Sequence, residues 1–361
     1  MILGVGLRRG ACLCLRDCVR AYVADVVGCR YVAGNQFGAG EIGLICGALA
    51  EDTRVLALWL KRNPLLPAGA VHLASMLRTN STLATLDLAN CGLLDEGVEV
   101  LFGGLRGNGA LRHLFLNVNG LTVKSARTIG DHLEGGSVLE ALGVDCNPLG
   151  ELRLLCCGDT VLTGCGVEGD VGIAEIARGL AHDTRLVRLS LASCSIGPAG
   201  ILSLVDALTP SHIRGAAHPR LGLLNLGFMK GTYVFNGLGN YMGDAGLDII
   251  SERLLRYVPS LVSLDISHNQ ISKVGLGRFA DALSTAALCR LSFGQFGQRR
   301  SYVLEARVKG LLRDNIRKWG KEAEGGRGGE DGWYDRGMQL LGDVECPPYV
   351  AEILSVYRTK D

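Results

Sequence analysis

Apolar residues recur along this chain in a fixed order of strand-like and helix-like spacing. A frame of the form L-x-x-L-x-L-x-x-N/C-x-L is repeated, and its apolar and polar residues alternate as they do in a half-buried strand. Apolar residues four apart follow each frame, as on one face of a helix, for example Leu73 and Leu77. Four such frames start 28 residues apart, at Val55, Leu83, Leu111 and Leu139. The pattern therefore predicts a repeated unit of one strand followed by one helix.

The frame extends in both directions, which gives about nine predicted strands between residues 27 and 294. The first copy carries Arg30 at a position where the others have an apolar residue. Intervals longer than 28 residues predict insertions near 150–168, 209–218 and 228–239. The additional frames start at Val27, Leu186, Leu221, Leu261 and Leu288.

The ninth position of the frame carries Asn or Cys, and this residue is expected to turn the chain at the end of the strand. A short polar side chain there can bond the backbone groups that the bend would otherwise leave unpaired. Cys91 and Cys194 occupy this position, so these two thiols are predicted to be structural.

The frame and its 28-residue period resemble the ribonuclease-inhibitor-like class of leucine-rich repeats, over about residues 27–294. That class also includes the repeat regions of NOD-like receptors and of the Ran GTPase-activating protein. The resemblance implies an α/β fold: a horseshoe-shaped solenoid with a parallel inner sheet and outer helices. Because the class shares a shape rather than an activity, the resemblance does not define a function.

Both ends depart from the repeat. Residues 1–26 are apolar at helical spacing and are interpreted as an N-terminal capping segment. Residues 295–319 predict an amphipathic C-terminal capping helix, and the Gly-rich polar stretch 320–332 predicts a linker. The tail, 333–361, either folds back onto the solenoid or forms a docking peptide; folding back is favoured because large exposed apolar patches are uncommon.

The composition limits which kinds of partner and which cellular compartment are expected. The net charge of +1 lacks the basic field that nucleic-acid binding requires, and no apolar run is long enough for a membrane helix. The 13 cysteines show no disulfide spacing, and the first residues make a poor signal peptide. We therefore expect reduced thiols, a cytoplasmic location, and neither nucleic acid nor membrane as a partner.

No motif predicts catalysis, a metal site or a cofactor. Residues 164–169 match G-x-G-x-x-G, but the helix after them fits the repeat frame, which leaves no second half for a dinucleotide-binding sheet. Cys156, Cys157 and Cys165 lack the spacing of a metal site. The motif is therefore interpreted as an inserted loop, and catalytic, metal and cofactor residues are predicted to be absent.

The concave face of the sheet holds the candidate partner-binding residues. Three aromatic residues occupy the central position of the first four strands, although only 6% of the chain is aromatic. Solvent-facing aromatics among polar residues are typical of an interface hot spot; alternatively, the N-terminal segment covers them or they are isolated surface residues. The predicted partner-binding residues, including two in the 228–239 loop, are Tyr31, Trp59, Lys61, Asp87, His113, Phe115, Asn117, Tyr233 and Phe235.

These features favour a non-enzymatic scaffold that binds another protein through its concave face and edge loops. The alternative is a regulator resembling the Ran GTPase-activating protein, although the acidic C-terminal stretch of that family is missing here. A third hypothesis is innate sensing similar to that of the NOD-like receptors. No phosphate-binding loop of the form G-x4-G-K-S/T is present, so under this hypothesis the chain would be only the sensing part.

Overall fold

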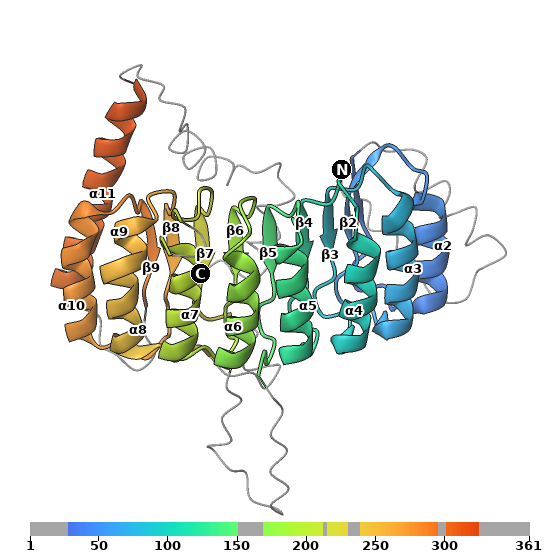
Figure 1. Ribbon diagram of the computed structural model, residues 1–361, viewed down its shortest axis with the longest axis horizontal. Coiled ribbons are helices and arrows are strands. Elements are labelled where there is room, and N and C mark those ends of the chain that lie inside the picture. The colour runs from blue at the N-terminus through green and yellow to red at the C-terminus, as the bar shows by residue number, and fades with distance from the viewer. Residues whose placement is uncertain (1–27, 151–168, 212–214, 230–238, 295–300, 325–361) are drawn as a thin grey trace, which may run out of the picture.

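A single parallel sheet forms one layer of the protein. The computed structural model describes residues 28–150, 169–211, 215–229, 239–294 and 301–324. Within those residues, nine strands pair side by side in sequence order, so the sheet remains open at β1 and β9 (Figure 1). The strands are β1 (Gly28–Tyr31), β2 (Val55–Trp59), β3 (Thr85–Asp87), β4 (His113–Phe115), β5 (Ala141–Gly143), β6 (Arg188–Ser190), β7 (Leu223–Asn225), β8 (Ser263–Asp265) and β9 (Arg290–Ser292).

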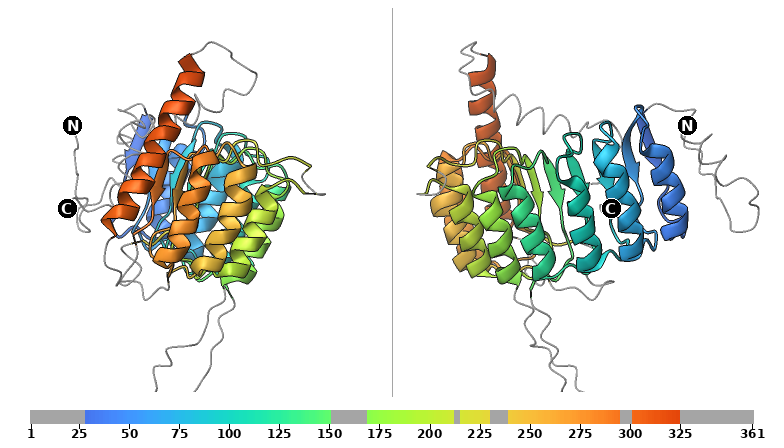
Figure 2. Two further views of the ribbon diagram at one scale, coloured as in Figure 1. Left: turned by 90° about the vertical axis from the view of Figure 1, so that its left-hand side faces the viewer. Right: turned by 45° about the vertical axis from the view of Figure 1, so that its right-hand side comes forward.

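Helices connect the strands and form a second layer on one face of the sheet (Figure 2). This arrangement confirms the predicted leucine-rich-repeat solenoid with a parallel sheet and helices outside it. The helices are α2 (Ala39–Leu49), α3 (Leu66–Thr79), α4 (Leu94–Leu105), α5 (Val123–Glu134), α6 (Gly169–Leu180), α7 (Pro198–Leu208), α8 (Gly243–Ile249), α9 (Leu255–Tyr257), α10 (Lys273–Ala282) and α11 (Tyr302–Glu324), with a π-helical turn over Ile250–Leu254 and a 3-10 turn over Leu283–Thr285.

The core is a ladder of aliphatic side chains between the two layers. In one repeat, Leu83, Leu86 and Leu88 point from the strand frame toward the helix, and Leu101 and Leu105 face them. All five are at most 3% exposed. Burial of each such side chain contributes about 1.5–3 kcal/mol, and equivalent residues in the next repeat extend the same cluster. No repeat could bury its apolar face alone, so the repeats must stack.

An asparagine ladder closes the bend after each strand. The Oδ1 of Asn119 accepts hydrogen bonds from the Cys91 and Leu93 amides of the preceding repeat, both at 3.1 Å. Its Nδ2 donates to the carbonyls of Leu88 and Leu116, at 2.9 and 3.0 Å. One amide side chain therefore satisfies four backbone groups and ties two repeats together.

Cysteine can occupy the same ladder position, as predicted. The Cys91 thiol donates to the Leu60 carbonyl at 3.4 Å, and the Cys194 thiol donates to the Val144 carbonyl at 3.4 Å. A thiol cannot offer the second donor or the strong acceptor of an amide. These two positions therefore hold the bend with fewer bonds than Asn119 does.

In the seventh repeat the ladder residue is displaced along the chain. Asn240 accepts from the amides of Cys194 and Ile196 and donates to the carbonyls of Leu191 and Leu226. It lies 14 residues after Leu226, where the regular frame has a separation of three. The predicted insertion near 228–239 therefore interrupts the turn itself, between the strand and its ladder residue.

The residue before six of the ladder positions adopts a left-handed backbone, with φ between 54° and 60°. This conformation costs roughly 1–2 kcal/mol for a residue with a Cβ, and β-branched Val118 is an unusual residue to find in it. The hydrogen bonds of the adjacent ladder residue hold the chain in this bend. The residues concerned are Arg62, Asn90, Val118, Cys146, Ser193 and His268.

A second polar ladder closes the opposite bend, from helix to strand. The Asn108 side chain accepts from the amides of Ala110 and Leu111, both at 2.9 Å, and donates to the carbonyls of Leu77 and Asn80. Its equivalents, three residues before the strand frame, are Asp52, Asn80, Asp183 and His218.

Helix α11 covers the last repeat. Val308 is fully buried in the main core, and the Asn315 side chain donates to the carbonyls of Leu283 and Leu288. The helix continues to Glu324, beyond the expected end at residue 319. The expected capping segment 1–26 and tail 333–361 lie outside the described residues.

Replacing Asn119 by Ala should lower the free energy of unfolding by about 3 kcal/mol, because four buried backbone groups lose their partner. Cys91→Ala, at the same position one repeat earlier, should cost about 1 kcal/mol because only weak thiol bonds are lost. Urea denaturation of both variants measures the difference. Equal losses would contradict the ladder as the source of this stability.

Candidate functional site

Large side chains lie next to one another on the concave face, the side of the sheet away from the helices. The central residues of the first four strands are in register, in the order Tyr31, Trp59, Asp87 and Phe115. The ring centroids of Tyr31 and Trp59 are 6.3 Å apart. The Lys61 ammonium lies 5.4 Å from the centroid of the Tyr31 ring, which is within cation–π range. The structure thus brings these five predicted residues into one row, which we call the aromatic row.

The structure corrects the exposure expected for these residues. Trp59 is 3% exposed and packs against Ala57 and Phe115, and the predicted residues Lys61, Asp87 and Asn117 are also buried. Adjacent strands are only about 4.8 Å apart, so large side chains in register cover one another. The accessible residues are therefore Tyr31, which is 52% exposed, and His113 and Phe115, which are partly exposed.

Gly143 allows the ring of Phe115 to lie against the next strand. A Cβ at Gly143 would lie 3.0 Å from Cδ1 of Phe115 and 3.0 Å from Oδ1 of Asn117. Such a contact is too close for an unshifted side chain. The central residue of β5 must therefore be a glycine for the Phe115 ring to keep this position at the end of the aromatic row.

A polar network continues the concave face beyond the aromatic row. Oδ1 of Asp145 accepts hydrogen bonds from the Ser190 hydroxyl at 2.6 Å and from the Ala192 amide at 2.8 Å. Its Oδ2 accepts from Nδ2 of Asn117 at 3.2 Å. The Ser190 hydroxyl in turn accepts from Nδ2 of Asn225 at 2.9 Å. Side chains from four successive repeats are thereby fixed relative to one another.

Burial shifts the ionisation of the acidic groups in this face. It raises the pKa of Asp145 to about 6, although the Ser190 and Ala192 hydrogen bonds oppose the change; the charge of Asp265 adds to it. Burial also raises the pKa of Asp87, against the amide of Ala89 and the charge of Lys61. Both carboxyls are therefore held nearer to the neutral form than an exposed aspartate.

His113 lies on β4, two residues before Phe115 of the aromatic row. Its Nδ1 is 2.9 Å from the Thr85 hydroxyl. Burial lowers the pKa of His113, and the nearby charge of Arg188 lowers it further. The imidazole is therefore neutral near pH 7 and can exchange hydrogen bonds with a bound partner.

The prediction from sequence missed Asp145, Ser190 and Asn225 as members of one network. The sequence signal was available, because all three occupy concave positions of consecutive repeats and have short polar side chains. The predicted contact residues Tyr233 and Phe235, and the loop 151–168, lie outside the described residues.

The described residues show no arrangement suited to metal binding, since no three His, Cys, Asp or Glu side chains among them are grouped to hold an ion. Among the described residues, Cys46, Cys91, Cys194 and Cys289 are free thiols, and all four are buried. Burial raises the pKa of the Cys46 and Cys91 thiols to about 12 and that of Cys289 to about 11. These thiols are therefore poor nucleophiles.

Family comparison agrees with the fold. The "Leucine Rich repeat" family model matches residues 79–102 and 259–280. The chain is 27% identical over 240 residues to the ribonuclease inhibitor of Sus scrofa, covering 57% of this chain and 51% of that protein. The chain is thus a leucine-rich-repeat protein of the ribonuclease-inhibitor-like class.

Two further relatives share the repeat. Human "NACHT, LRR and PYD domains-containing protein 12" is 28% identical over 226 residues, covering 62% of this chain and 18% of that protein. Human "Leucine-rich repeat-containing protein 73" is 29% identical over 221 residues, covering 56% and 70%. The chain therefore spans about half of the ribonuclease inhibitor and less than a fifth of the NACHT protein.

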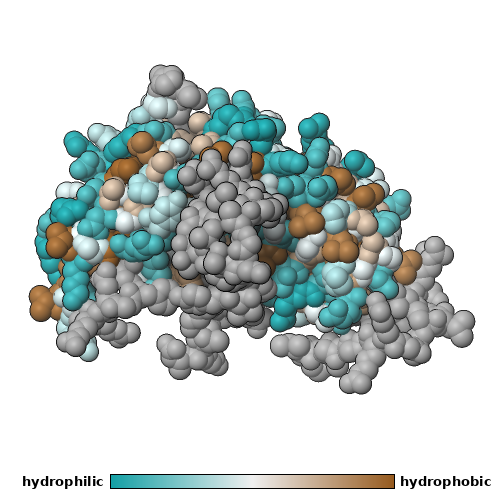
Figure 3. All heavy atoms as spheres, turned by 90° about the horizontal axis from the view of Figure 1, so that it is seen from below, coloured by the Kyte–Doolittle hydropathy of each residue, from teal (hydrophilic) through white to brown (hydrophobic). Residues whose placement is uncertain are grey.

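Helices of the described chain do not have the length and apolarity needed to cross a bilayer. Viewed from below, where the strand-to-helix turns lie, the described apolar residues form separate spots among hydrophilic ones (Figure 3).

Asp145→Asn should change how stability depends on pH. Because the folded-state pKa of Asp145 is raised, its stabilising contribution is complete at low pH and is lost as pH rises through about 6. Over a shift of about two units this loss amounts to about 3 kcal/mol. Urea unfolding at pH 4.5 and 7.5 should show the wild type losing more stability than the variant. Parallel pH profiles would exclude this role of Asp145.

The described thiols should resist alkylation in the folded protein. Iodoacetamide at pH 8 should leave Cys46, Cys91, Cys194 and Cys289 unmodified, because burial raises the pKa of each. All four should react in guanidinium chloride, which serves as the control. Peptide mass spectrometry reports the modification of each cysteine. Rapid labelling of any of the four in the folded protein would contradict the burial of that thiol.

Proposed function

We propose that this chain is a non-enzymatic scaffold that binds another protein on its concave face, over β1 to β7. The observation that carries the proposal is the aromatic row, in which exposed Tyr31 and partly exposed Phe115 flank buried Trp59 and Asp87. Aromatic residues that present apolar area beside polar groups are typical of interface hot spots.

The buried members of the row support binding by holding the accessible ones in place. Trp59 packs against Phe115 and lies beside Tyr31, while the Lys61 ammonium approaches the Tyr31 ring. Side chains that are already ordered lose less conformational freedom when a partner docks. Tyr31 and Phe115 would thus act as pre-positioned anchors, with His113, on the same strand as Phe115, as a hydrogen-bonding group.

The edge loops extend the proposed surface. Phe228, at the start of the loop that contains Tyr233 and Phe235, packs edge-to-face against His268 with 5.6 Å between ring centroids. The described residues on either side of this loop, Phe228 and Gly239, lie between β7 and α8, at the strand-to-helix edge of the second half of the sheet. Loops on a repeat scaffold commonly carry binding residues, which supports a second contact there.

Relatives support a protein-directed role: one is named as an inhibitor of a ribonuclease. The cytoplasm is the proposed compartment, supported by the free, buried thiols of Cys46, Cys91, Cys194 and Cys289. The GTPase-activating alternative is not proposed, because no observation on the described residues favours it.

A photo-crosslinking amino acid placed at Tyr31 or at Phe115 should capture one and the same partner protein from the source cell. Placed at Tyr257, which is 43% exposed on α9 of the outer layer, it should not capture that partner. Tyr31→Ala should weaken binding of the captured protein about tenfold, since hot-spot truncations cost more than 1 kcal/mol. Mass spectrometry identifies the adducts.

Thermal unfolding of each variant controls for stability. Equal capture from Tyr257, or unchanged affinity of a folded Tyr31→Ala variant, would contradict binding on the concave face.

A further inference from the structure

Neighbouring outer helices touch through one pair of positions that recurs in each repeat. Between α3 and α4 these positions hold Ala74 and Gly104, and a Cβ on Gly104 would lie 2.5 Å from the Cα of Ala74. Between α5 and α6 they hold Gly130 and Gly179, and a Cβ on Gly179 would lie 2.2 Å from the Gly130 carbonyl oxygen. Small residues at both positions therefore bring these helix backbones into direct contact.

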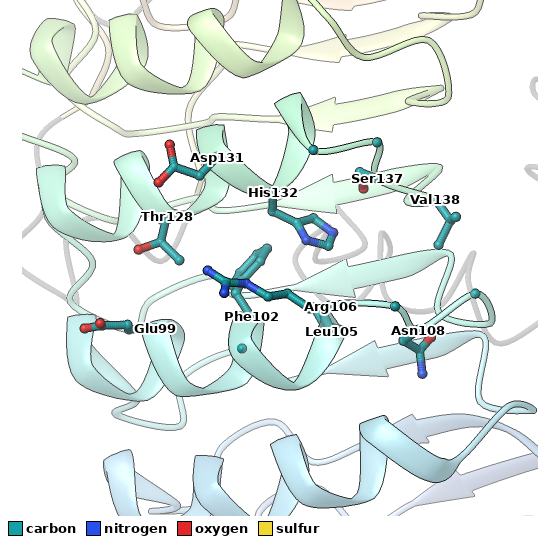
Figure 4. Close-up of a pocket in the computed structure, with 15 residues that line it drawn as sticks. Glu99, Phe102, Leu105, Arg106, Asn108, Thr128, Asp131, His132, Ser137 and Val138 are labelled. Atoms are coloured by element: carbon teal, nitrogen blue, oxygen red, sulfur yellow. The ribbon is translucent and has the colours of Figure 1, made fainter.

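Between α4 and α5 the same two positions hold Phe102 and His132. Their rings meet edge to face, with centroids 5.1 Å apart and planes at 74°. Two rings require more room than two small residues, so α4 and α5 pack less closely than the helix pairs on either side. A groove of about 720 Å³ opens between them at their C-terminal ends (Figure 4).

The groove has apolar side chains and bare backbone in its walls. Buried Leu105 and Phe102, each 3% exposed, form its floor, and partly exposed Val138 and His132 stand in its wall. A Cβ added at Gly103 or at Gly136 would meet no other atom within 4 Å, so the space beside these glycines is open. The volume lies in the range of sites that accept small molecules.

Arg106 supplies a cationic group to this groove. It follows the last turn of α4 and extends along the groove toward Phe102 and His132 (Figure 4). Its guanidinium forms no ion pair with the described residues, whereas Asp131 on the opposite wall is paired with Arg178. Burial lowers the pKa of His132 against the opposing charge of Asp183, and the charge of Arg106 also lowers it, so the imidazole is neutral near pH 7.

We propose that the groove between α4 and α5 is a binding site for a small planar aromatic anion. Its ring would lie against partly exposed His132, above the buried Phe102 ring, and its acid group would pair with Arg106. Stacking and edge-to-face contacts favour a flat ring beside two aromatic side chains, and the unpaired guanidinium favours a carboxylate or sulfonate. This site lies on the helical layer and is independent of the concave face.

Binding of 2-naphthoate, followed by saturation-transfer NMR, tests the charge requirement. Neutral 2-naphthamide, which has the same ring system, should bind at least fivefold more weakly. Arg106→Gln should reduce naphthoate affinity to the level of naphthamide. Arg78→Gln is the matched control, because Arg78 occupies the same position in α3, where the helices are closely packed, and it should bind as the wild type does.

Filling the groove tests its location. Gly103→Trp should abolish naphthoate binding without lowering the melting temperature, because the added side chain has room and glycine is a poor helix former. Gly47→Trp, at the corresponding position of α2 and also beside open space, should bind normally. Absence of saturable naphthoate binding, or retention of binding in the Gly103→Trp or Arg106→Gln variants, would overturn the proposal.

Discussion

The structure depends on one constraint: the backbone amides and carbonyls at the two bends of each repeat need hydrogen-bond partners. Most strands contain only three residues, so the sheet ladder pairs few groups and the turns contain many buried amides and carbonyls. Asn119 on one edge and Asn108 on the other each bond backbone groups in two repeats. These bonds fix the spacing of the repeats, and the leucine core fills the space between the two ladders.

The strand frames could be predicted because three apolar residues and one ladder residue lie close together in the sequence. Asn240 could not be assigned from that frame, since an insertion separates it from Leu226. Its signal was the residues after it, because Met242 and Gly246 repeat the spacing that follows Asn63. The ladder residue thus belongs to the turn into the helix as much as to the strand.

Strand alternation alone does not predict exposure on the concave face, because exposure depends on lateral neighbours about 28 residues away. Strand alternation correctly places Trp59 and Asp87 on that face, but it does not show how far one side chain covers the next. Phe115 is only partly buried because Gly143 beside it has no side chain, so its ring has room toward β5. Reading the same position across repeats, with side-chain size included, would have identified which residues stay accessible.

The same size argument explains both candidate surfaces. The ladders and leucines determine the backbone, so the remaining positions can change size from repeat to repeat without altering the fold. On the concave face, large residues in register produce the aromatic row. On the outer layer, Phe102 and His132 replace the small pairs found in the neighbouring repeats and separate two helices. Ridges and grooves therefore form on the surface of this solenoid where one repeat differs in side-chain size from its neighbours at an equivalent position. The residues at that position in the neighbouring repeats are natural control sites for mutagenesis.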